Sequence, residues 1–269
     1  MKRLLVANRG EIAVRIIRTA QEMGIETVLA VSEADTSSVA ADLADSVTVI
    51  GPAQATKSYL NRAALIEAVR RTEADGVHPG YGFLSEDAEF AQAVEDLGVS
   101  WVGPSAKSIA LMGNKAAARQ AAHDAGVPIL EGSRGAANTG EDLLSAAQAV
   151  GYPLLIKAAA GGGGRGIRMV ESPDRLFDEI RLAGTEAGAA FGDPTVYFER
   201  YIKDARHVEV QILGDGSDVI HLFDRDCSLQ RRRQKIVEET PAPNIPDALR
   251  EQMLDAAVAL ARACHYKGA

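Results

Sequence analysis

The sequence predicts an α/β protein in which a parallel sheet is followed by a smaller antiparallel region. Two observations predict this fold class. Over residues 1–102, short apolar runs alternate with stretches whose apolar residues recur at helical spacing, and repeated strand–helix units form parallel sheets with helices on both faces. Over residues 208–223, apolar and polar residues alternate around Asp215-Gly216, which is typical of an antiparallel hairpin.

The first region contains five expected strands and the helices between them. The strands are expected at Leu4–Ala7, Thr27–Val31, Ser46–Ile50, Gly76–His78 and Val99–Val102. The helices are expected over Glu11–Met23, from a cap at Asn61 to about Arg71, and from a cap at Ser85 to Asp96. Ligands of parallel sheets bind beyond the carboxyl ends of the strands, and His78–Gly82 lies at such an end.

Two further regions follow along the chain. In the second, strands are expected at Pro153–Ala158, Ile167–Val170 and Val196–Tyr201, and helices at Leu143–Val150 and after Ser172-Pro173. In the third, strands are expected at Val208–Ile212 and Val219–Phe223, and a helix over Asp247–Cys264. In the strand from Val208, apolar residues alternate with Glu209 and Gln211, which predicts one buried face.

Composition excludes several classes of protein. The 269 residues are 46% hydrophobic and 25% charged, as in soluble globular proteins, and no apolar run is long enough to span a bilayer. The net charge of −8 argues against nucleic acid as a partner. The two cysteines, Cys227 and Cys264, cannot form a disulfide framework or a metal cluster, so a cytoplasmic protein is expected.

A glycine run at Gly161–Gly166 joins two expected strands. The common phosphate loops instead join a strand to a helix, so this run predicts a hairpin flap whose backbone N–H groups face an anion. Lys157 lies just upstream in an apolar strand, and its charge is costly to bury unless an anion meets it. Together they favour a lid over phosphates, and a flexible loop without a ligand is the alternative.

A cluster of cations follows in this acidic chain. Arg231, Arg232, Arg233 and Lys235 stand close together before Glu238-Glu239. Such a cluster needs counter-ions, which favours a site for phosphate and bicarbonate, with a solvated basic patch as the alternative. Considered singly, Lys115, Glu199 and His207 are also compatible with ordinary surface or edge residues, and Cys227 with a small structural residue.

Taken together, these segments resemble the biotin carboxylase family, within the larger ATP-grasp group. The matching segments are Ala7–Ala13, His78–Glu86, Gly103–Ser105, Leu111–Lys115, Lys157-Ala158 with the glycine flap, His207–Glu209 and Arg225–Arg232. They occur in order along essentially the whole chain. The resemblance implies a Rossmann-like parallel-sheet N-terminal domain over residues 1–112, a linker and ATP-grasp lid subdomain over 113–203, and an incomplete ATP-grasp C-terminal subdomain over 204–269.

The resemblance also implies a role for each matching residue. The phosphates of ATP would be held by Lys115 and Lys157 and covered by the flap residues Gly162, Gly163, Gly164, Arg165 and Gly166. The adenine pocket would include Glu199, Arg200 and Ile202, and the other nucleotide contacts would be His207, Gln230 and Arg233, where the family usually has histidine. Lys235 would be the catalytic lysine on the bicarbonate side, and Tyr81 and Gly82 would form the wall near biotin.

In this family, ATP phosphorylates bicarbonate, the carboxyphosphate gives CO2, and biotin N1 is carboxylated. The implied cofactors and partners are ATP, Mg2+, bicarbonate, a biotin carboxyl carrier domain and the carboxyltransferase subunit of an acyl-CoA carboxylase or, as a second choice, of a pyruvate carboxylase. Arg18 and Glu22 match positions at the family's homodimer interface. The family's magnesium ligands and catalytic arginine would follow Ala269, so we expect this chain to be inactive alone.

Two other interpretations compete with this one. Another ATP-grasp ligase, of the carbamoyl-phosphate or purine pathway type, would keep a glycine flap but would not combine His78–Glu86 with Arg225–Lys235. A non-catalytic fragment used for association is the other alternative. The first turn contains Gly10 without the glycine spacing of dinucleotide oxidoreductases, which argues against that class of enzyme.

Overall fold

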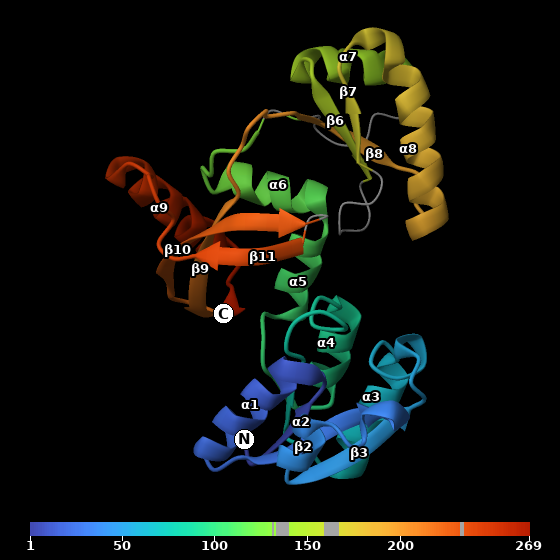
Figure 1. Cartoon of the computed structure of the whole chain (residues 1–269), viewed down its shortest axis with the longest axis vertical. Helices are drawn as coiled ribbons and strands as arrows, with labels where there is room; N and C mark the ends of the chain where they lie inside the picture. Colours follow the sequence, from blue (N-terminus) through green and yellow to red (C-terminus); the bar gives the residue numbers. More distant parts are fainter. Residues whose placement is uncertain (131, 133–139, 159–166, 232–233) are drawn as a thin grey trace. The chain divides into compact units, whose positions relative to one another are not determined.

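The computed structural model describes residues 1–130, 132, 140–158, 167–231 and 234–269 (Figure 1). These residues form two compact units. The first consists of Met1–Gly113 and His265–Ala269, and the second of Asn114–Cys264.

The first unit is built on a five-stranded sheet in the order β3-β2-β1-β4-β5. The strands are β1 (Arg3–Val6), β2 (Glu26–Ser32), β3 (Ser46–Gly51), β4 (Gly76–His78) and β5 (Ser100–Trp101). The helices are α1 (Gly10–Glu22), α2 (Val39–Leu43), α3 (Arg62–Thr72), α4 (Ala88–Asp96) and α5 (Ala106–Gly113), with short 3-10 turns η1 (Glu33–Asp35) and η2 (Ala55–Lys57) and a two-residue strand β12 (Lys267–Gly268). Every strand pair in the sheet is parallel, which confirms the predicted fold class.

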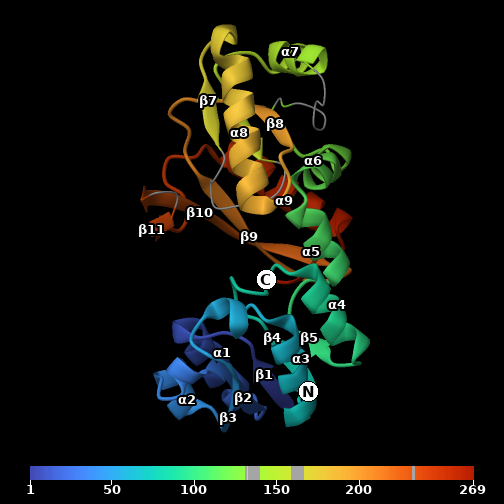
Figure 2. The same ribbon diagram turned by 90° about the vertical axis from the view of Figure 1, so that its right-hand side faces the viewer.

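Helices cover both faces of this sheet (Figure 2). Leu5 of β1 packs in the same core as Leu65 of α3 and Phe90 of α4. Its neighbour Leu4 points to the opposite face and packs with Ile17 of α1. Successive strand residues alternate between faces, so an apolar run that is buried on both sides, as in β1, requires helices above and below.

The two predicted helix caps have different outcomes. Asn61 caps α3 as predicted, because its side chain accepts a hydrogen bond from the Ala64 N–H at 3.2 Å. The cap predicted at Ser85 is wrong: α4 begins after Asp87, whose carboxylate accepts a hydrogen bond from the Phe90 N–H at 2.8 Å. A carboxylate at this position also gains from the positive end of the helix dipole.

The second unit begins with α6 (Lys115–Asp124) and contains two antiparallel sheets. The smaller sheet has the order β7-β6-β8. Its strands are β6 (Leu154–Ala158), β7 (Arg168–Val170) and β8 (Val196–Arg200), accompanied by α7 (Gly140–Val150), η3 (Pro173–Arg175) and α8 (Leu176–Phe191). Apolar residues of β6, β8 and α8, including Ile156, Phe198 and Leu176, form its core. A strand, a hairpin partner and a long helix were all predicted here.

The larger sheet of this unit pairs β11, β10 and β9 in that order. The strands are β9 (Val208–Asp215), β10 (Val219–Arg231) and β11 (Gln234–Glu239), and α9 (Asp247–Ala263) follows them. The hairpin β9–β10 was predicted, but β10 is longer than expected and β11 was not predicted. The predicted burial of one face of β9 is also wrong, because Val208, Glu209, Val210, Gln211 and Ile212 are all half-buried.

One extra residue in β10 sets which side chains share a face. His221 pairs with Ile212, but the next pair is Asp224 with Val210, so β10 has one residue more than β9 between them. This β-bulge includes Phe223, a non-glycine residue with a φ of +64°. Beyond the bulge, Asp224 faces the same side as Val210, and its neighbour Arg225 faces the opposite side together with Glu209.

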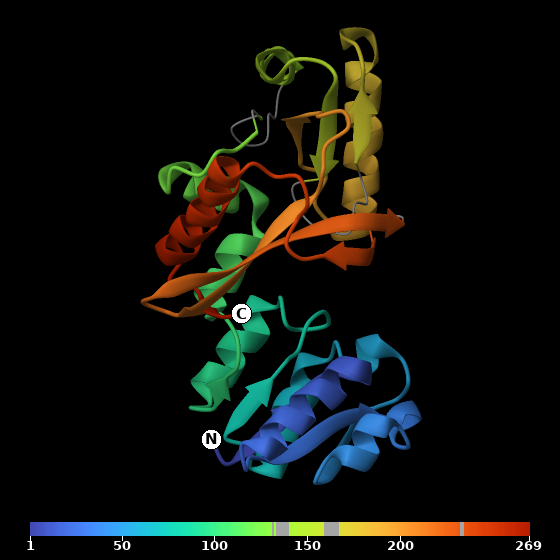
Figure 3. The ribbon, with the colours of Figure 1, turned by 60° about the vertical axis from the view of Figure 1, so that its left-hand side comes forward.

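Helix α9 covers the Asp224 face of the sheet (Figure 3). The Asp224 side chain is fully buried, and one oxygen accepts a hydrogen bond from Arg250 Nε of α9 at 3.0 Å. The other oxygen accepts from the Ala242 N–H at 2.9 Å. The opposite face carries Glu209 and Arg225. We call it the open face, because α9 does not cover it. Among the helices that the structure describes, none is long and apolar enough to cross a membrane.

Asp224 should be a large single contributor to the stability of the second unit. In Asp224→Asn, Arg250 loses its buried counter-charge, and we expect the free energy of unfolding to fall by about 3 kcal/mol, the lower end of the range for a broken buried ion pair. Urea unfolding followed by circular dichroism measures this change. The exposed Asp218→Asn is the matched control, expected within about 0.5 kcal/mol of the parent; equal effects of both changes would refute the assignment.

Candidate active site

The predicted site residues are distributed over three places in the fold. Tyr81 and Gly82 follow β4 in the first unit, Lys157, Glu199, Arg200 and Ile202 lie on or beside the smaller sheet, and His207, Gln230 and Lys235 lie on or beside the larger sheet. The flap residues Gly162, Gly163, Gly164, Arg165 and Gly166, and also Arg233, lie outside the described residues. Lys115 is described only as the first residue of α6.

Lys157 and Glu199 form an ion pair across the smaller sheet. They lie on adjacent antiparallel strands, where Lys157 is directly opposite Tyr197 and Glu199 is directly opposite Leu155. The Lys157 ammonium donates to the Glu199 carboxylate, and the two side chains are only 21% and 15% exposed. The counter-charge that the buried lysine requires is therefore present in the protein itself. Sequence reasoning placed both residues at the nucleotide but did not predict that they pair.

Two further residues lie on or just after β8, Tyr197 and Ile202. Burial, followed by the nearby charge of Glu199, raises the pKa of Tyr197 to about 12, so its hydroxyl keeps its proton at neutral pH. Ile202 is 47% exposed and presents an apolar side chain just after β8. The exposed Arg200 is the last residue of β8.

The structure brings His207, Gln230 and Lys235 together on the larger sheet. His207 directly precedes β9, and its Nδ1 lies 2.9 Å from Gln230 Nε2 of β10. Gln230 is the direct cross-strand partner of Lys235 on β11. These residues are far apart in sequence, and the antiparallel register places them side by side.

Glu209 is the centre of an ionic network on this face. Its carboxylate accepts a hydrogen bond from the Lys235 ammonium and lies 2.5 Å from an Arg225 nitrogen. Lys235 also lies 3.4 Å from Glu238, and the Cys227 thiol donates to Glu238 at 3.8 Å. Lys235 is thus held by carboxylates rather than standing in a solvated patch. Sequence reasoning missed Glu209, Arg225 and Glu238, whose roles depend on strand register.

The network shifts the pKa values of its members. The hydrogen bond to Glu209 raises the pKa of Lys235, although burial works against it. Burial would raise the pKa of Glu209, but the hydrogen bond from Lys235 and the charge of Arg225 outweigh it, so the pKa is lowered. Burial and the charge of Glu209 raise the pKa of the Cys227 thiol. At neutral pH, Lys235 is a cation, Glu209 an anion and Cys227 a neutral thiol.

The loop after β4 is fixed by Asn8, at the end of β1. The Asn8 amide, which is only 3% exposed, donates to the carbonyls of Pro79 at 2.6 Å and Tyr81 at 2.8 Å. Gly80 has a φ of +64°, and a Cβ there would lie 2.8 Å from the Asn8 amide nitrogen. Only glycine fits this position. Tyr81 remains 61% exposed and is presented to solvent by a rigid loop.

Comparison with protein families distinguishes the biotin carboxylase family from other ATP-grasp ligases. A model described as the biotin carboxylase N-terminal domain matches residues 1–109, and one described as the carbamoyl-phosphate synthase L chain ATP-binding domain matches residues 114–269. Biotin carboxylase 1 of Bacillus subtilis (strain 168) is 50% identical over 270 residues, which cover 100% of this chain and 60% of that protein. The chain belongs to the biotin carboxylase family. Its second part alone would also fit a carbamoyl-phosphate enzyme, and its first part removes that ambiguity.

Other members of the biotin carboxylase family match over the same length. The mitochondrial methylcrotonoyl-CoA carboxylase subunit alpha of Arabidopsis thaliana is 47% identical over 270 residues, which cover 100% of this chain and 37% of that protein. The biotin carboxylase domain dimer of the Hydrogenobacter thermophilus 2-oxoglutarate carboxylase, in complex with MgADP, ADP and bicarbonate, is 41% identical, with a TM-score of 0.92. The match covers 99% of this chain and 59% of that one. The chain therefore spans between about a third and three fifths of these relatives.

His78, at the carboxyl end of β4, predicts a pH-dependent stability of the first unit. Burial lowers the pKa of His78, and its neutral Nδ1 accepts the Gly80 N–H at 3.0 Å. Because the unfolded histidine has a pKa of about 6.5, stability should be complete above that pH and should fall as the pH drops through the lower folded value.

The single tryptophan, Trp101 on β5, reports unfolding of this unit by fluorescence. We expect the free energy of unfolding of the parent to decrease from pH 7 to pH 5 and that of His78→Asn to decrease less. His123→Asn, at an exposed position of α6, should keep the parent's pH dependence. Parallel pH profiles for the parent and His78→Asn would count against this explanation.

Proposed function

We propose that the protein takes part in the ATP-dependent carboxylation of biotin, with bicarbonate as the source of the carboxyl group. In the proposed reaction, ATP phosphorylates bicarbonate, the carboxyphosphate releases CO2 and phosphate, and N1 of biotin is carboxylated. The observation that carries the proposal is the network around Lys235, where a cation beside His207 and Gln230 is held in position on the open face of the sheet. Phosphoryl transfer depends mainly on such positioning and charge neutralisation.

Within this proposal, Lys235 meets bicarbonate. To do so it exchanges its contact with Glu209 for the anion, and Arg225 remains beside Glu209 to neutralise it. A carboxylate that has two cations can release one without leaving an uncompensated charge, which would otherwise be costly at a half-buried position. The contact to Glu238 keeps Lys235 near the sheet during this exchange.

The remaining roles follow the family assignments. Lys115, Lys157 and the flap residues 162–166 bind the phosphates, and Glu199, Arg200 and Ile202 bind adenine. His207, Gln230 and Arg233 make the other nucleotide contacts, and Tyr81 and Gly82 line the biotin side. The division into domains at residues 1–112, 113–203 and 204–269 belongs to the same proposal. The ion pair of Lys157 with Glu199 supports it, because phosphates would compete with one carboxylate for a cation already in place.

We propose that Mg2+ binds only together with ATP. Among the described residues, His207, Glu209 and Cys227 form a group of three potential ligands that combines an imidazole, a carboxylate and a thiol. Mg2+ requires oxygen ligands in octahedral geometry, so this set does not fit it.

The proposed partners are a biotin carboxyl carrier domain, a carboxyltransferase subunit and a second copy of this chain. Arg18 and Glu22 are both exposed on α1, one helical turn apart, which suits a contact surface. The similarity to a methylcrotonoyl-CoA carboxylase subunit supports an acyl-CoA carboxylase as the parent complex. A cytoplasmic location is part of the proposal and agrees with two cysteines that are both free thiols.

Substitution of Lys157 tests the nucleotide assignment. We expect Lys157→Met to weaken MgATP binding at least tenfold, because a cation 4 Å from a phosphate contributes up to about 4 kcal/mol at an effective dielectric constant of 20, before desolvation is subtracted. Isothermal titration calorimetry of the chain with MgATP measures the dissociation constant. Lys107→Met, on an exposed side of α5, is the control and should bind as the parent does.

Two results would contradict the proposal. The first is an unchanged dissociation constant in Lys157→Met with the circular dichroism spectrum preserved. The second concerns the reaction: we expect no phosphate release by this chain alone, and release that depends on ammonia rather than on bicarbonate and free biotin would favour the carbamoyl-phosphate class instead.

A further inference from the structure

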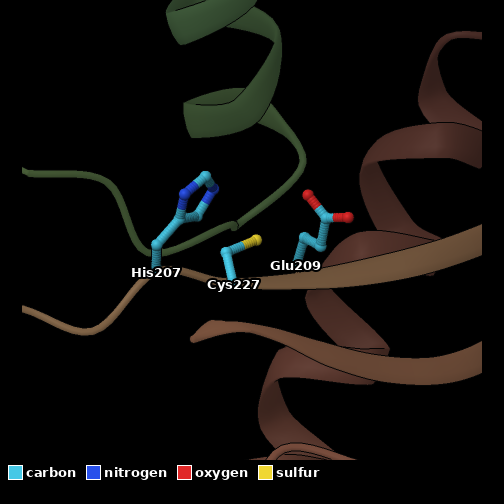
Figure 4. A group of neighbouring side chains, drawn as sticks. All are labelled: His207, Glu209 and Cys227. Atoms are coloured by element: carbon cyan, nitrogen blue, oxygen red, sulfur yellow. The ribbon is translucent and has the colours of Figure 1, made fainter. Parts of the chain in front are cut away.

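Three potential metal ligands converge on the open face of the larger sheet. An imidazole nitrogen of His207, a carboxylate oxygen of Glu209 and the sulfur of Cys227 all lie within 4.8 Å of one another. Figure 4 shows the three side chains rising from the same side of the strand pair. Glu209 lies on β9 and Cys227 on β10, and the backbone of His207, directly before β9, is held by a hydrogen bond from the Cys227 N–H.

The antiparallel register explains why these residues meet. His207 and Glu209 are two residues apart and therefore face the same side. Cys227 stands across from His207, because its N–H donates to the His207 carbonyl at 2.9 Å. The Gln230 amide nitrogen lies 2.9 Å from Nδ1 of the His207 ring and helps to hold the ring beside the sheet.

The kind of donor indicates which ion would bind. Imidazole, thiolate and carboxylate together suit Zn2+, which binds tetrahedrally to three protein ligands and leaves one position open. Zinc–ligand distances of about 2.0–2.3 Å place neighbouring ligands roughly 3.5 Å apart, so the cluster would contract by about 1 Å at its widest. His207 is exposed and its side chain can move. Magnesium and calcium, which prefer oxygen ligands, are poor candidates.

Both oxygens of Glu209 are paired with cations. Its Oε1 lies 2.5 Å from an Arg225 nitrogen. The other oxygen holds Lys235. A divalent cation at this position would replace the charge of Lys235, and Arg225 would stay in place. The thiol must lose its proton, which burial opposes, so only an ion with a strong preference for thiolate can bind.

We propose that His207, Glu209 and Cys227 form a binding site for a soft divalent cation such as Zn2+, and that the ion displaces Lys235 from Glu209. Occupancy would also block MgATP, because His207 is assigned to the nucleotide; this second clause rests on the proposed function. The metal site itself does not depend on it.

Direct metal binding tests the site. The chelator-treated chain is titrated with Zn2+ against a chromophoric chelator, and with Co2+ as a spectroscopic probe. We expect one tight site per chain, a sulfur-to-cobalt charge-transfer absorption in the near ultraviolet, and no displacement by excess Mg2+. Cys227→Ser should lose the absorption and weaken Zn2+ binding at least tenfold, whereas Cys264→Ser, at the other buried cysteine of the same unit, should change neither.

A second variant keeps the test decisive if Cys227→Ser does not fold. His207→Gln changes an exposed side chain and should also weaken Zn2+ binding at least tenfold, with the circular dichroism spectrum of the parent. Parent-like Zn2+ affinity in either folded variant, or a cobalt complex without the sulfur absorption, would overturn the site. Competition is measured separately: if Zn2+ binds as expected but the dissociation constant of MgATP is unchanged, the blocking clause fails and the metal site stands.

Discussion

Lysines that are paired with carboxylates are the interaction around which the candidate site is organised. The chain carries a net charge of −8, and its proposed substrates, ATP and bicarbonate, are anions. Such ligands require lysines in the site, and a lysine that is partly withdrawn from water needs a counter-charge when no ligand is bound. Glu199 meets this requirement for Lys157, and Glu209 meets it for Lys235. In both cases an incoming anion replaces a carboxylate that already neutralises the lysine. The charge of the lysine is therefore also balanced when no ligand is bound.

The fold class could be predicted because the signal is local. Short buried strands and amphipathic helices each have a characteristic spacing of apolar residues in the sequence. This spacing predicted the parallel sheet of the first unit. Asn61 was recognised as a cap by residue type alone, whereas the prediction of a cap at Ser85 failed, because Asp87, two residues later, also has a capping side chain and its charge is favoured by the helix dipole.

The candidate site was predictable residue by residue but not as an arrangement. Family resemblance pointed to Lys157, Glu199, His207, Gln230 and Lys235, and the structure brings the first two together and the last three together. Sequence alone could not show that Glu209 is shared by Lys235 and Arg225, because that depends on the pairing of three strands. The same limitation concealed Cys227, which was interpreted from the sequence as a small structural residue, although its sulfur lies beside His207 and Glu209.

The bulge in β10 has a consequence for how this protein can change during evolution. One additional residue between His221 and Asp224 determines that Asp224 faces α9 while Arg225 faces Glu209. Regular pairing of the same residues without the bulge would place Arg225 against α9 and Asp224 on the open face. A deletion of one residue between His221 and Asp224 would instead restore regular pairing and leave both faces unchanged. We therefore expect homologues either to keep the bulge or to lack one residue in this segment. Longer insertions and deletions should accumulate in the hairpin turn around Gly216.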